Sequence, residues 1–363
     1  TTDILVDVDE PWYPMNFTIF ANNYGSRYTG KFRAGLTWEW GNLTKNGDIL
    51  SITGITTPKD VDDLLYYKVG YTLPLNGYGT KASISYSYMD YEVGKELAIL
   101  GIEGESKIFG VSVSHPLIRG RDKNLSWSAS IKKKKFTNYL FEKLYRVRGV
   151  GYKMTDEYAT LELGISGDCL KKKTHTYFTL NSTFGLGEAF GGMADKEYTN
   201  SSRPGLANGS WVKLNFDLTR IRQIGVCQLI TRASGQWASD NLVAGEQFII
   251  GGPDTVRAYP TGEYLGDYGY FVSAELRTPF LPGKTSLNKN INWAFFIDHG
   301  ATYYNTVLPG EEKHHSLTGA GVGLRIYIPC HFNMSFDVGY PVSGPDPSDN
   351  DNVHYWIQAV LKF

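Results

Sequence analysis

The chain has 363 residues, with 36 basic against 37 acidic side chains and a formal net charge of −1. This balance excludes broad electrostatic capture of nucleic acid, which needs a strongly basic surface. No run of 18 apolar residues occurs, so no transmembrane helix is expected. The three cysteines lack the C-x-x-C spacing of a metal site, and we expect no bound metal and no cofactor.

The first nine residues, Thr1 to Asp9, alternate weakly and are interpreted as the last strand of a preceding unit. From Trp12 onward a stronger alternation repeats. Between Tyr28 and Trp40, for example, Leu36 and Trp38 share one face of a strand and Thr37 the other, because side chains on a strand have a period of two. The same split between an apolar and a polar face recurs along Lys81–Met89, Asn124–Lys132 and Glu157–Ser166.

The alternating segments are about 10–13 residues long, which matches the 9–11 residues of a tilted transmembrane strand better than the roughly 5–6 of a soluble sheet. We therefore predict an all-β fold, a 16-stranded antiparallel transmembrane β-barrel of the bacterial outer membrane. The predicted strands are 13–22, 29–40, 47–56, 63–74, 78–90, 104–116, 124–136, 156–168, 174–185, 210–220, 223–236, 270–280, 291–303, 316–328, 331–340 and 353–363.

Short and long connections alternate along the chain, as periplasmic turns and extracellular loops do in such barrels. The predicted short turns are Gly41–Gly47, Leu75–Gly77, Ile221–Arg222 and Pro329–Cys330. The sixth extracellular loop, residues 236–269, is the longest connection and shows no strand pattern. A loop of this length in a compact β protein is functional or disordered. Its Gly, Pro and aromatic residues predict that it folds into the barrel lumen.

Alternation along the strands that follow this loop directs Trp293, Phe295 and Ile297 to lipid, and so directs Asp298 into the lumen. Glu275 faces inward on the preceding predicted strand. An inserted loop could therefore bring Arg257 to either carboxylate. From spacing alone, a solvated Arg257 and a merely lumen-lining Asp298 are an equal alternative.

Several motifs resemble the two-partner secretion transporters, the TpsB family, which is related to the BamA-type barrel assembly factors. The family's V-R-G-Y or V-R-A-Y loop motif is matched by Val256, Arg257, Ala258 and Tyr259. Its F-x-D-x-G strand motif is matched by Phe296, Asp298 and Gly300. The resemblance implies that Arg257 pairs with Asp298 inside the barrel and fixes the loop tip. It also implies a passage that exports one large, TpsA-like partner exoprotein.

The N-terminus departs from this family, whose members carry a plugging helix and two periplasmic POTRA domains before the barrel. By the resemblance, residues 1–10 are the remnant of the second POTRA domain with its linker, and residues 11–363 are the barrel.

The C-terminal segment also resembles a known signal. Tyr355, Leu361 and Phe363 share a face of the last predicted strand, and such a strand ending in Phe resembles the signal by which outer-membrane barrels are recognised for assembly. The expected partners are thus the exoprotein, outer-membrane lipid and, during biogenesis, the barrel assembly machinery. We expect a monomer that binds no nucleic acid.

Other motifs favour no second chemistry. Gly319, Gly321 and Gly323 precede no helix and are interpreted as lumen-facing residues that leave room for the loop. His314 and His315 are interpreted as surface residues, and Lys132–Lys135 as a strand end running into solvent in preference to a substrate-steering patch. No Ser/His/Asp spacing suits catalysis, so we expect no catalytic residue and no enzyme.

The alternative function is that of a BamA-type factor that inserts other barrels through a seam between Met15–Asn22 and Val353–Phe363. These segments alternate regularly without a glycine kink, which favours export. A diffusion porin is a third possibility, but a V-R-A-Y loop is no part of a porin.

Overall fold

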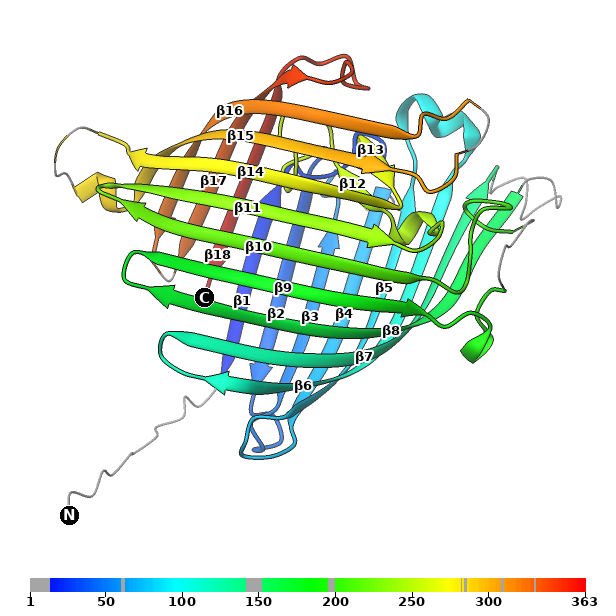
Figure 1. Cartoon of the computed structure of the whole chain (residues 1–363), viewed down its shortest axis with the longest axis horizontal. Helices are drawn as coiled ribbons and strands as arrows, with labels where there is room; N and C mark the ends of the chain where they lie inside the picture. Colours follow the sequence, from blue (N-terminus) through cyan, green and yellow to red (C-terminus); the bar gives the residue numbers. More distant parts are fainter. Residues whose placement is uncertain are drawn as a thin grey trace.

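A computed structural model describes residues 14–59, 63–141, 152–194, 200–281, 283, 286–307, 310–329 and 331–363. Within these residues, sixteen antiparallel strands close into one barrel, and every strand pairs with its neighbours in chain order (Figure 1). The first strand, β1, pairs with the last, β18, so the sheet has no free edge. The predicted fold class and strand number are confirmed.

The barrel strands have the following bounds: β1 Met15–Asn22, β2 Arg33–Gly41, β3 Ile49–Thr56, β4 Leu64–Pro74, β5 Lys81–Glu92, β6 Glu103–Arg119, β7 Lys123–Leu140, β8 Tyr152–Lys171, β9 Thr174–Gly185, β10 Val212–Ile224, β11 Cys227–Ala238, β14 Tyr268–Pro279, β15 Ile291–Tyr303, β16 His314–Ile328, β17 Phe332–Ser343 and β18 His354–Lys362. Short 3-10 helices lie between strands: η2 Lys95–Leu100, η3 Ala189–Gly191, η4 Ala244–Glu246 and η5 Ser286–Lys289.

Alternation along β15 shows how the strands divide lipid from lumen. Trp293, Phe295 and Ile297 are exposed on the outer face, whereas Phe296 and Asp298 are 5% and 0% exposed on the inner face. Because successive side chains point to opposite sides of a strand, a single register fixes both the apolar band and the residues that meet the loop. No helix among the described residues is long and apolar enough to cross a membrane.

The strands differ from the predicted ones in two ways. β6, β7 and β8 contain 17, 18 and 20 residues, more than a bilayer crossing requires. The added residues lie at both ends of these strands: 117–119 and 169–171 beside the short turns, and 137–140 and 152–155 beside the long loops. The predicted turn at Ile221–Arg222 is wrong, because β10 continues to Ile224 and the chain reverses at Gly225, whose φ is 60°. Gly tolerates this left-handed conformation, so it determines where the turn forms.

The sequence shows no strand pattern in the long sixth loop, but the structure places two short strands there. The loop contains a two-stranded sheet, β12 (Phe248–Ile250) with β13 (Tyr264–Gly266), separate from the barrel sheet. This small sheet lies against β14 and β15, as Figure 1 shows. Its strands are only three residues long, too short to give a periodic signal in the sequence. The predicted remnant at residues 1–10 lies outside the described residues.

The seam between β1 and β18 is regular over its length. Its register runs from Thr18 opposite Lys362 to Asn22 opposite Gln358. Beyond the paired strands, Phe17 and the terminal Phe363 exchange two backbone hydrogen bonds, with N–O distances of 3.2 and 2.9 Å. The last residue thus completes the ladder that closes the barrel.

Deleting Phe363 is expected to lower the folded fraction, because the seam loses both of these hydrogen bonds and an exposed apolar ring at its end. Folded barrel is measured by its heat-modifiable mobility on denaturing gels of outer-membrane fractions. The matched control is Tyr327→Ala, which removes an exposed aromatic ring from β16 without touching the seam. Equal yields for both variants would contradict the closing role of Phe363.

Candidate functional site

The tip of the sixth loop is a tight turn inside the barrel. Gly251 and Gly252 have φ values of 95° and 103°, a conformation that favours glycine. The backbone N–H of Gly252 donates to the carbonyl oxygens of Val256 and Tyr259, at 3.2 and 3.0 Å. This turn projects Arg257 away from the loop and toward the barrel wall.

Arg257 is the most strongly bonded residue of the tip. Its Nε and Nη2 donate to Oδ2 and Oδ1 of Asp298, at 2.8 and 2.9 Å, and its Nη1 donates to Oε2 of Glu275 at 2.7 Å. Its guanidinium carbon lies 3.4 Å from the centroid of the Phe296 ring. Arg257 is 2% exposed and Asp298 is 0% exposed. Bidentate pairing and ring stacking together make a strong, geometrically specific contact.

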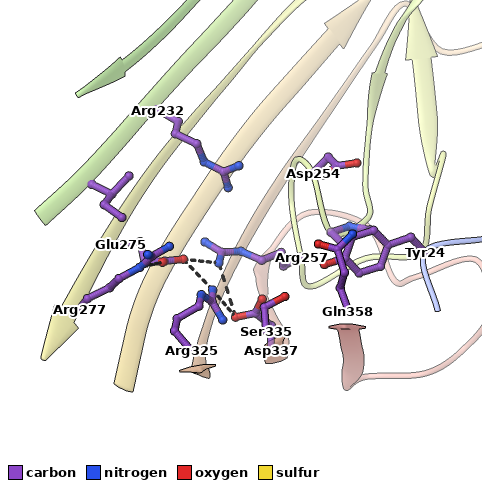
Figure 2. A pocket seen from close by; sticks show the side chains of 12 residues that line it. Tyr24, Arg232, Asp254, Arg257, Glu275, Arg277, Arg325, Ser335, Asp337 and Gln358 are labelled. Carbon is purple, nitrogen blue, oxygen red and sulfur yellow. Dashed lines mark hydrogen bonds and ion pairs between the residues drawn. The ribbon is translucent and has the colours of Figure 1, made fainter. Parts of the chain in front are cut away.

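Glu275 extends this pair into a wider charge network. It also accepts from Nη2 of Arg325 at 2.9 Å and from Nε of Arg277 at 2.7 Å, and Arg325 in turn binds Asp337 at 2.8 Å. Figure 2 shows these side chains around a cavity of about 390 Å³ beneath the loop tip. Arg257, Arg277 and Arg325 thus form hydrogen-bonded ion pairs with Asp298, Glu275 and Asp337. Arg232 and Asp254 line the same cavity.

Glycines on the wall make room for the tip. A Cβ at Gly319 would lie 2.2 Å from Cβ of Ala258, and one at Gly339 would lie 2.5 Å from the backbone oxygen of Arg257. At Gly300 the nearest atom, on Ile250, would be 3.1 Å away. The tip therefore approaches the backbone of β15, β16 and β17 more closely than side chains would permit.

Packing and hydrogen bonds hold the rest of the motif. Val256, Ala258 and Tyr259 are fully buried and belong to one apolar cluster of the inserted loop and the wall. The indole N–H of Trp356 donates to the backbone oxygen of Arg257 at 2.7 Å. The hydroxyl of Tyr259 donates to the carbonyl oxygen of Ser343 at 3.3 Å.

A second buried cluster, which the sequence analysis missed, holds the start of the loop against strands β7, β8 and β10. Glu246 of η4 is 5% exposed. Its carboxylate accepts from Lys134 of β7 at 2.6 Å, from Lys213 of β10 at 2.5 Å, and from the hydroxyl of Tyr158 of β8 at 2.8 Å. The loop thus has ionic contacts at two separated positions.

This cluster corrects the interpretation of Lys132–Lys135 as a strand end in solvent. The four residues lie within β7, and each binds a carboxylate. Alternation directs Lys134 to the lumen with Lys132, beside Glu162. That inward pair of lysines was the available signal, because lumenal ammonium groups in a shielded site need acidic partners.

The charge of Glu246 depends on these partners. Burial alone would raise the pKa of its carboxyl, but the ammonium groups of Lys134 and Lys213 outweigh burial and lower the pKa to about 2. A folded-state pKa below the unfolded one adds stability above the unfolded pKa, and this stability is lost as pH falls through the folded value. The cluster should therefore stay intact at pH 5 and weaken between about pH 4 and pH 2.

Asp267 closes the loop at its far end. Its carboxylate accepts from Arg203 Nη1 and from the backbone N–H groups of Leu242 and Asn305, each at 2.9 Å. Asp267 is fully buried, so these three bonds replace its hydration. Both ends of the loop are therefore fastened beside the mouth of the barrel.

The remaining residues singled out in the sequence lie elsewhere. Tyr355, Leu361 and Phe363 are exposed on the outer face of the barrel at the seam, and so point away from the lumen that holds the loop tip. His315 stacks on Tyr264 of the loop at 3.9 Å and is not a bare surface residue, in contrast to the interpretation from sequence. No group of three or more potential metal ligands occurs among the described residues.

Replacing Glu246 with Gln is expected to loosen the start of the loop, because two lysine charges lose their shared partner at a cost of about 3–5 kcal/mol. In a protein that carries Ala244→Cys, the new thiol should then react faster with a thiol reagent at pH 7 when Glu246 is replaced than when Glu246 is kept. Glu263→Gln is the control, since Glu263 binds Ser348 at an exposed position of the same loop. Unchanged labelling in Glu246→Gln would contradict the anchor.

Comparisons with known proteins agree with this architecture. Residues 1–326 match the family described as haemolysin secretion/activation protein ShlB/FhaC/HecB. The chain is 23% identical over 357 residues to the heme/hemopexin transporter protein HuxB of Haemophilus influenzae, covering 95% of this chain and 59% of that protein. It is 23% identical over 360 residues to the outer membrane transporter CdiB of Escherichia coli, covering 96% of this chain and 58% of that protein.

Solved structures share the fold. Escherichia coli CdiB superposes with a TM-score of 0.77 at 19% identity, over 98% of this chain and 64% of that one. BamA of Haemophilus ducreyi lacking POTRA domains 1–3 superposes with a TM-score of 0.66 at 11% identity, over 97% and 70%. The chain spans a little under three fifths of the length of the curated relatives it matches. Its sixteen strands form a barrel of the bacterial outer membrane. The chain belongs to the ShlB/FhaC/HecB family of haemolysin secretion/activation proteins, which is the TpsB family that its loop and strand motifs resemble.

Proposed function

We propose that this barrel is the translocation pore through which one large partner exoprotein crosses the outer membrane. The observation that carries the proposal is the buried contact of Arg257 with Asp298 and Glu275, which holds the long loop inside the lumen. An anchored loop narrows the lumen, which restricts the leakage of small solutes, and leaves a polar route for the exoprotein beside the loop. The family and its transporter relatives HuxB and CdiB support this assignment.

The distribution of accessible surface supports a route along the wall away from the loop. On the loop side, Ser273 and Glu275 are each 6% exposed. On the other side, inward hydroxyl residues of β3, β5 and β6, such as Thr53, Ser83 and Ser112, are only half-buried. An extended polypeptide moving along that wall would meet small hydroxyl groups, which hydrogen-bond it transiently and offer few strong charges to hold it.

Further expectations follow from this proposal. The pore carries out no catalysis, and Val256, Ala258, Phe296 and Gly300 serve only to seat the arginine. Tyr355, Leu361 and Phe363 form the surface that the barrel assembly machinery recognises during biogenesis. The protein acts as a monomer in outer-membrane lipid, without a cofactor and without nucleic acid, and residues 1–10 are the remnant of the second POTRA domain with its linker.

The second candidate, insertion of other barrels, has one observation in its favour. The fold resembles BamA, and a barrel that inserts others must open its seam. Against it stands the continuous register between β1 and β18, extended by both hydrogen bonds between Phe17 and Phe363. A closed seam suits a protein whose substrate passes through the lumen.

Replacing Arg257 with Ala is expected to reduce secretion while the barrel stays inserted. Asp298 and Glu275 lose a shared partner in a buried site, which costs about 3–5 kcal/mol and releases the loop tip. Gene deletion first identifies the exoprotein, as the one large protein lost from the medium. Secretion by each variant is then measured as the amount of this exoprotein in the medium. Arg257→Lys should be intermediate, because an ammonium keeps the charge but cannot bind bidentately.

The control for this variant is Arg277→Ala, which removes the same charge from the same network but from a strand and not from the loop. Normal secretion from a folded Arg257→Ala barrel, or an equal defect in Arg277→Ala, would argue against an anchoring role. Broad loss of outer-membrane proteins upon gene deletion would instead support the assembly function.

Locking the seam separates the two candidate functions. In a variant with its own cysteines replaced by Ser, Thr18→Cys and Lys362→Cys place two thiols on directly opposed residues of β1 and β18. Oxidation should leave secretion unchanged if the substrate uses the lumen, and abolish activity if the seam must open. Thr37→Cys with Thr53→Cys is the matched control, because those hydroxyls lie 3.1 Å apart between β2 and β3.

A further inference from the structure

The outer wall of β6, β7 and β8 carries an apolar notch at the level where the membrane-facing band ends. The notch encloses about 400 Å³ and is lined mainly by Phe109, Val111, Ile131, Ala159 and Phe190. Phe109, Val111 and Ile131 belong to the exposed apolar face of their strands. Ala159 is 1% exposed, because the chain around η3 folds over β8 from outside. The notch therefore opens toward lipid and not toward the lumen.

The height of the notch follows from strand geometry. β7 begins at Lys123 beside a short turn, and Ile131 is the last apolar outward residue before Lys133. At about 3.3 Å per residue and a tilt of roughly 40°, ten residues rise about 25 Å. This is the height of the apolar band of an outer-membrane barrel, so the notch faces the boundary between acyl chains and headgroups in the outer leaflet.

Lysines gather immediately above the notch on the same outer face. Lys107 of β6 lies directly opposite Lys135 of β7, and Lys133 lies two residues before Lys135. Two like charges directly opposite one another destabilise a strand pair. Two carboxylates offset part of this repulsion. Glu105 binds Lys107, and Glu157 binds both Lys133 and Lys135 at 2.9 Å.

These carboxylates do not saturate the two opposed ammonium groups. Each ammonium has three N–H donors, and a single carboxylate uses one of them. Lys133 differs, because it also donates to the carbonyl oxygens of Phe190 and Gly191, at 2.5 and 3.1 Å, and so ties η3 to the wall. An anion at the border would therefore bind between Lys107 and Lys135. Asp90 and Glu105 lie opposite each other at the next outward position above these lysines. Their negative charges repel an anion there, so the anion site does not extend above the border.

Phe190 forms the side of the notch that faces the membrane. Its side chain is 69% exposed, and its φ of 55° lies in the left-handed region that bulky residues seldom adopt. The two hydrogen bonds from Lys133 hold this strained conformation. An exposed aromatic ring held in a strained position beside an apolar notch is suited to contact an acyl chain.

We propose that this site binds one molecule of lipopolysaccharide from the outer leaflet, with an acyl chain in the notch and a lipid A phosphate between Lys107 and Lys135. Lipid A is the occupant that combines several acyl chains with phosphate groups at this membrane boundary. The spacing of an apolar notch directly below an opposed lysine pair matches that combination. The site lies outside the barrel and is independent of the anchored loop.

The test is native mass spectrometry of the purified, folded barrel incubated with hexa-acylated, bis-phosphorylated lipid A. Wild-type barrel should retain one lipid A molecule in the presence of excess phosphatidylglycerol, and dephosphorylated lipid A should be retained less. Lys107→Gln with Lys135→Gln should lower retention on the order of tenfold, since each lysine near an anionic lipid surface raises the binding affinity several-fold. Phe190→Asn should lower it too, because Asn tolerates the backbone conformation but cannot line the notch.

The matched control is Lys171→Gln with Lys172→Gln, which removes two charges at the turn between β8 and β9, at the opposite end of the barrel. This variant should retain lipid A as the wild type does. Heat-modifiable mobility shows whether each variant is folded. Equal retention by the wild type and the Lys107/Lys135 variant would overturn the proposal, and so would displacement of lipid A by phosphatidylglycerol at equal concentration.

Discussion

The interior of this barrel depends on one buried guanidinium. Arg257 has lost nearly all contact with water, and such a charge is tolerated only when its partners are close and correctly oriented. Asp298 provides the bidentate contact and Glu275 a third hydrogen bond. Because β14 and β15 are paired strands with one register, the two carboxylates are held at fixed positions relative to each other. The barrel wall thus provides a receptor for its own loop.

The inserted loop is a bridge with contacts on two walls. Its tip binds β14, β15 and β17 through Arg257, and its start binds β7, β8 and β10 through Glu246. A loop held at one point could swing, whereas two separated ionic clusters restrict its motion. Opening the lumen more widely requires breaking at least one of them. The proposed export route runs past the loop along the half-buried hydroxyl residues of β3, β5 and β6.

The outer face obeys a different physical constraint from the inner one. Strands β6 to β8 continue beyond the apolar band, so their outward residues change from Phe109 and Ile131 to Lys107 and Lys133 within one rung. On the inner face, Lys134 of the same strand β7 binds the loop. Alternation therefore lets one run of lysines serve two unrelated contacts, one with the loop and one with the membrane border.

The sequence by itself determined the number and order of the strands, because a period of two over 10–13 residues is a local property of each segment. It also determined which residues of β15 face inward, and together with the family motif it directed Arg257 to Asp298. Resemblance rather than spacing made that pairing the preferred one, since any inward carboxylate could have served.

Only the tertiary structure decided which residues complete the site. Glu246 meets Lys134 and Lys213 across 112 and 33 positions of sequence, and no periodicity links residues that far apart. The close approach of Ala258 to Gly319 likewise depends on where the loop enters the closed barrel. Strand patterns are set by neighbours in the chain, whereas contacts between a loop and a distant wall arise only when the barrel closes and brings the two together.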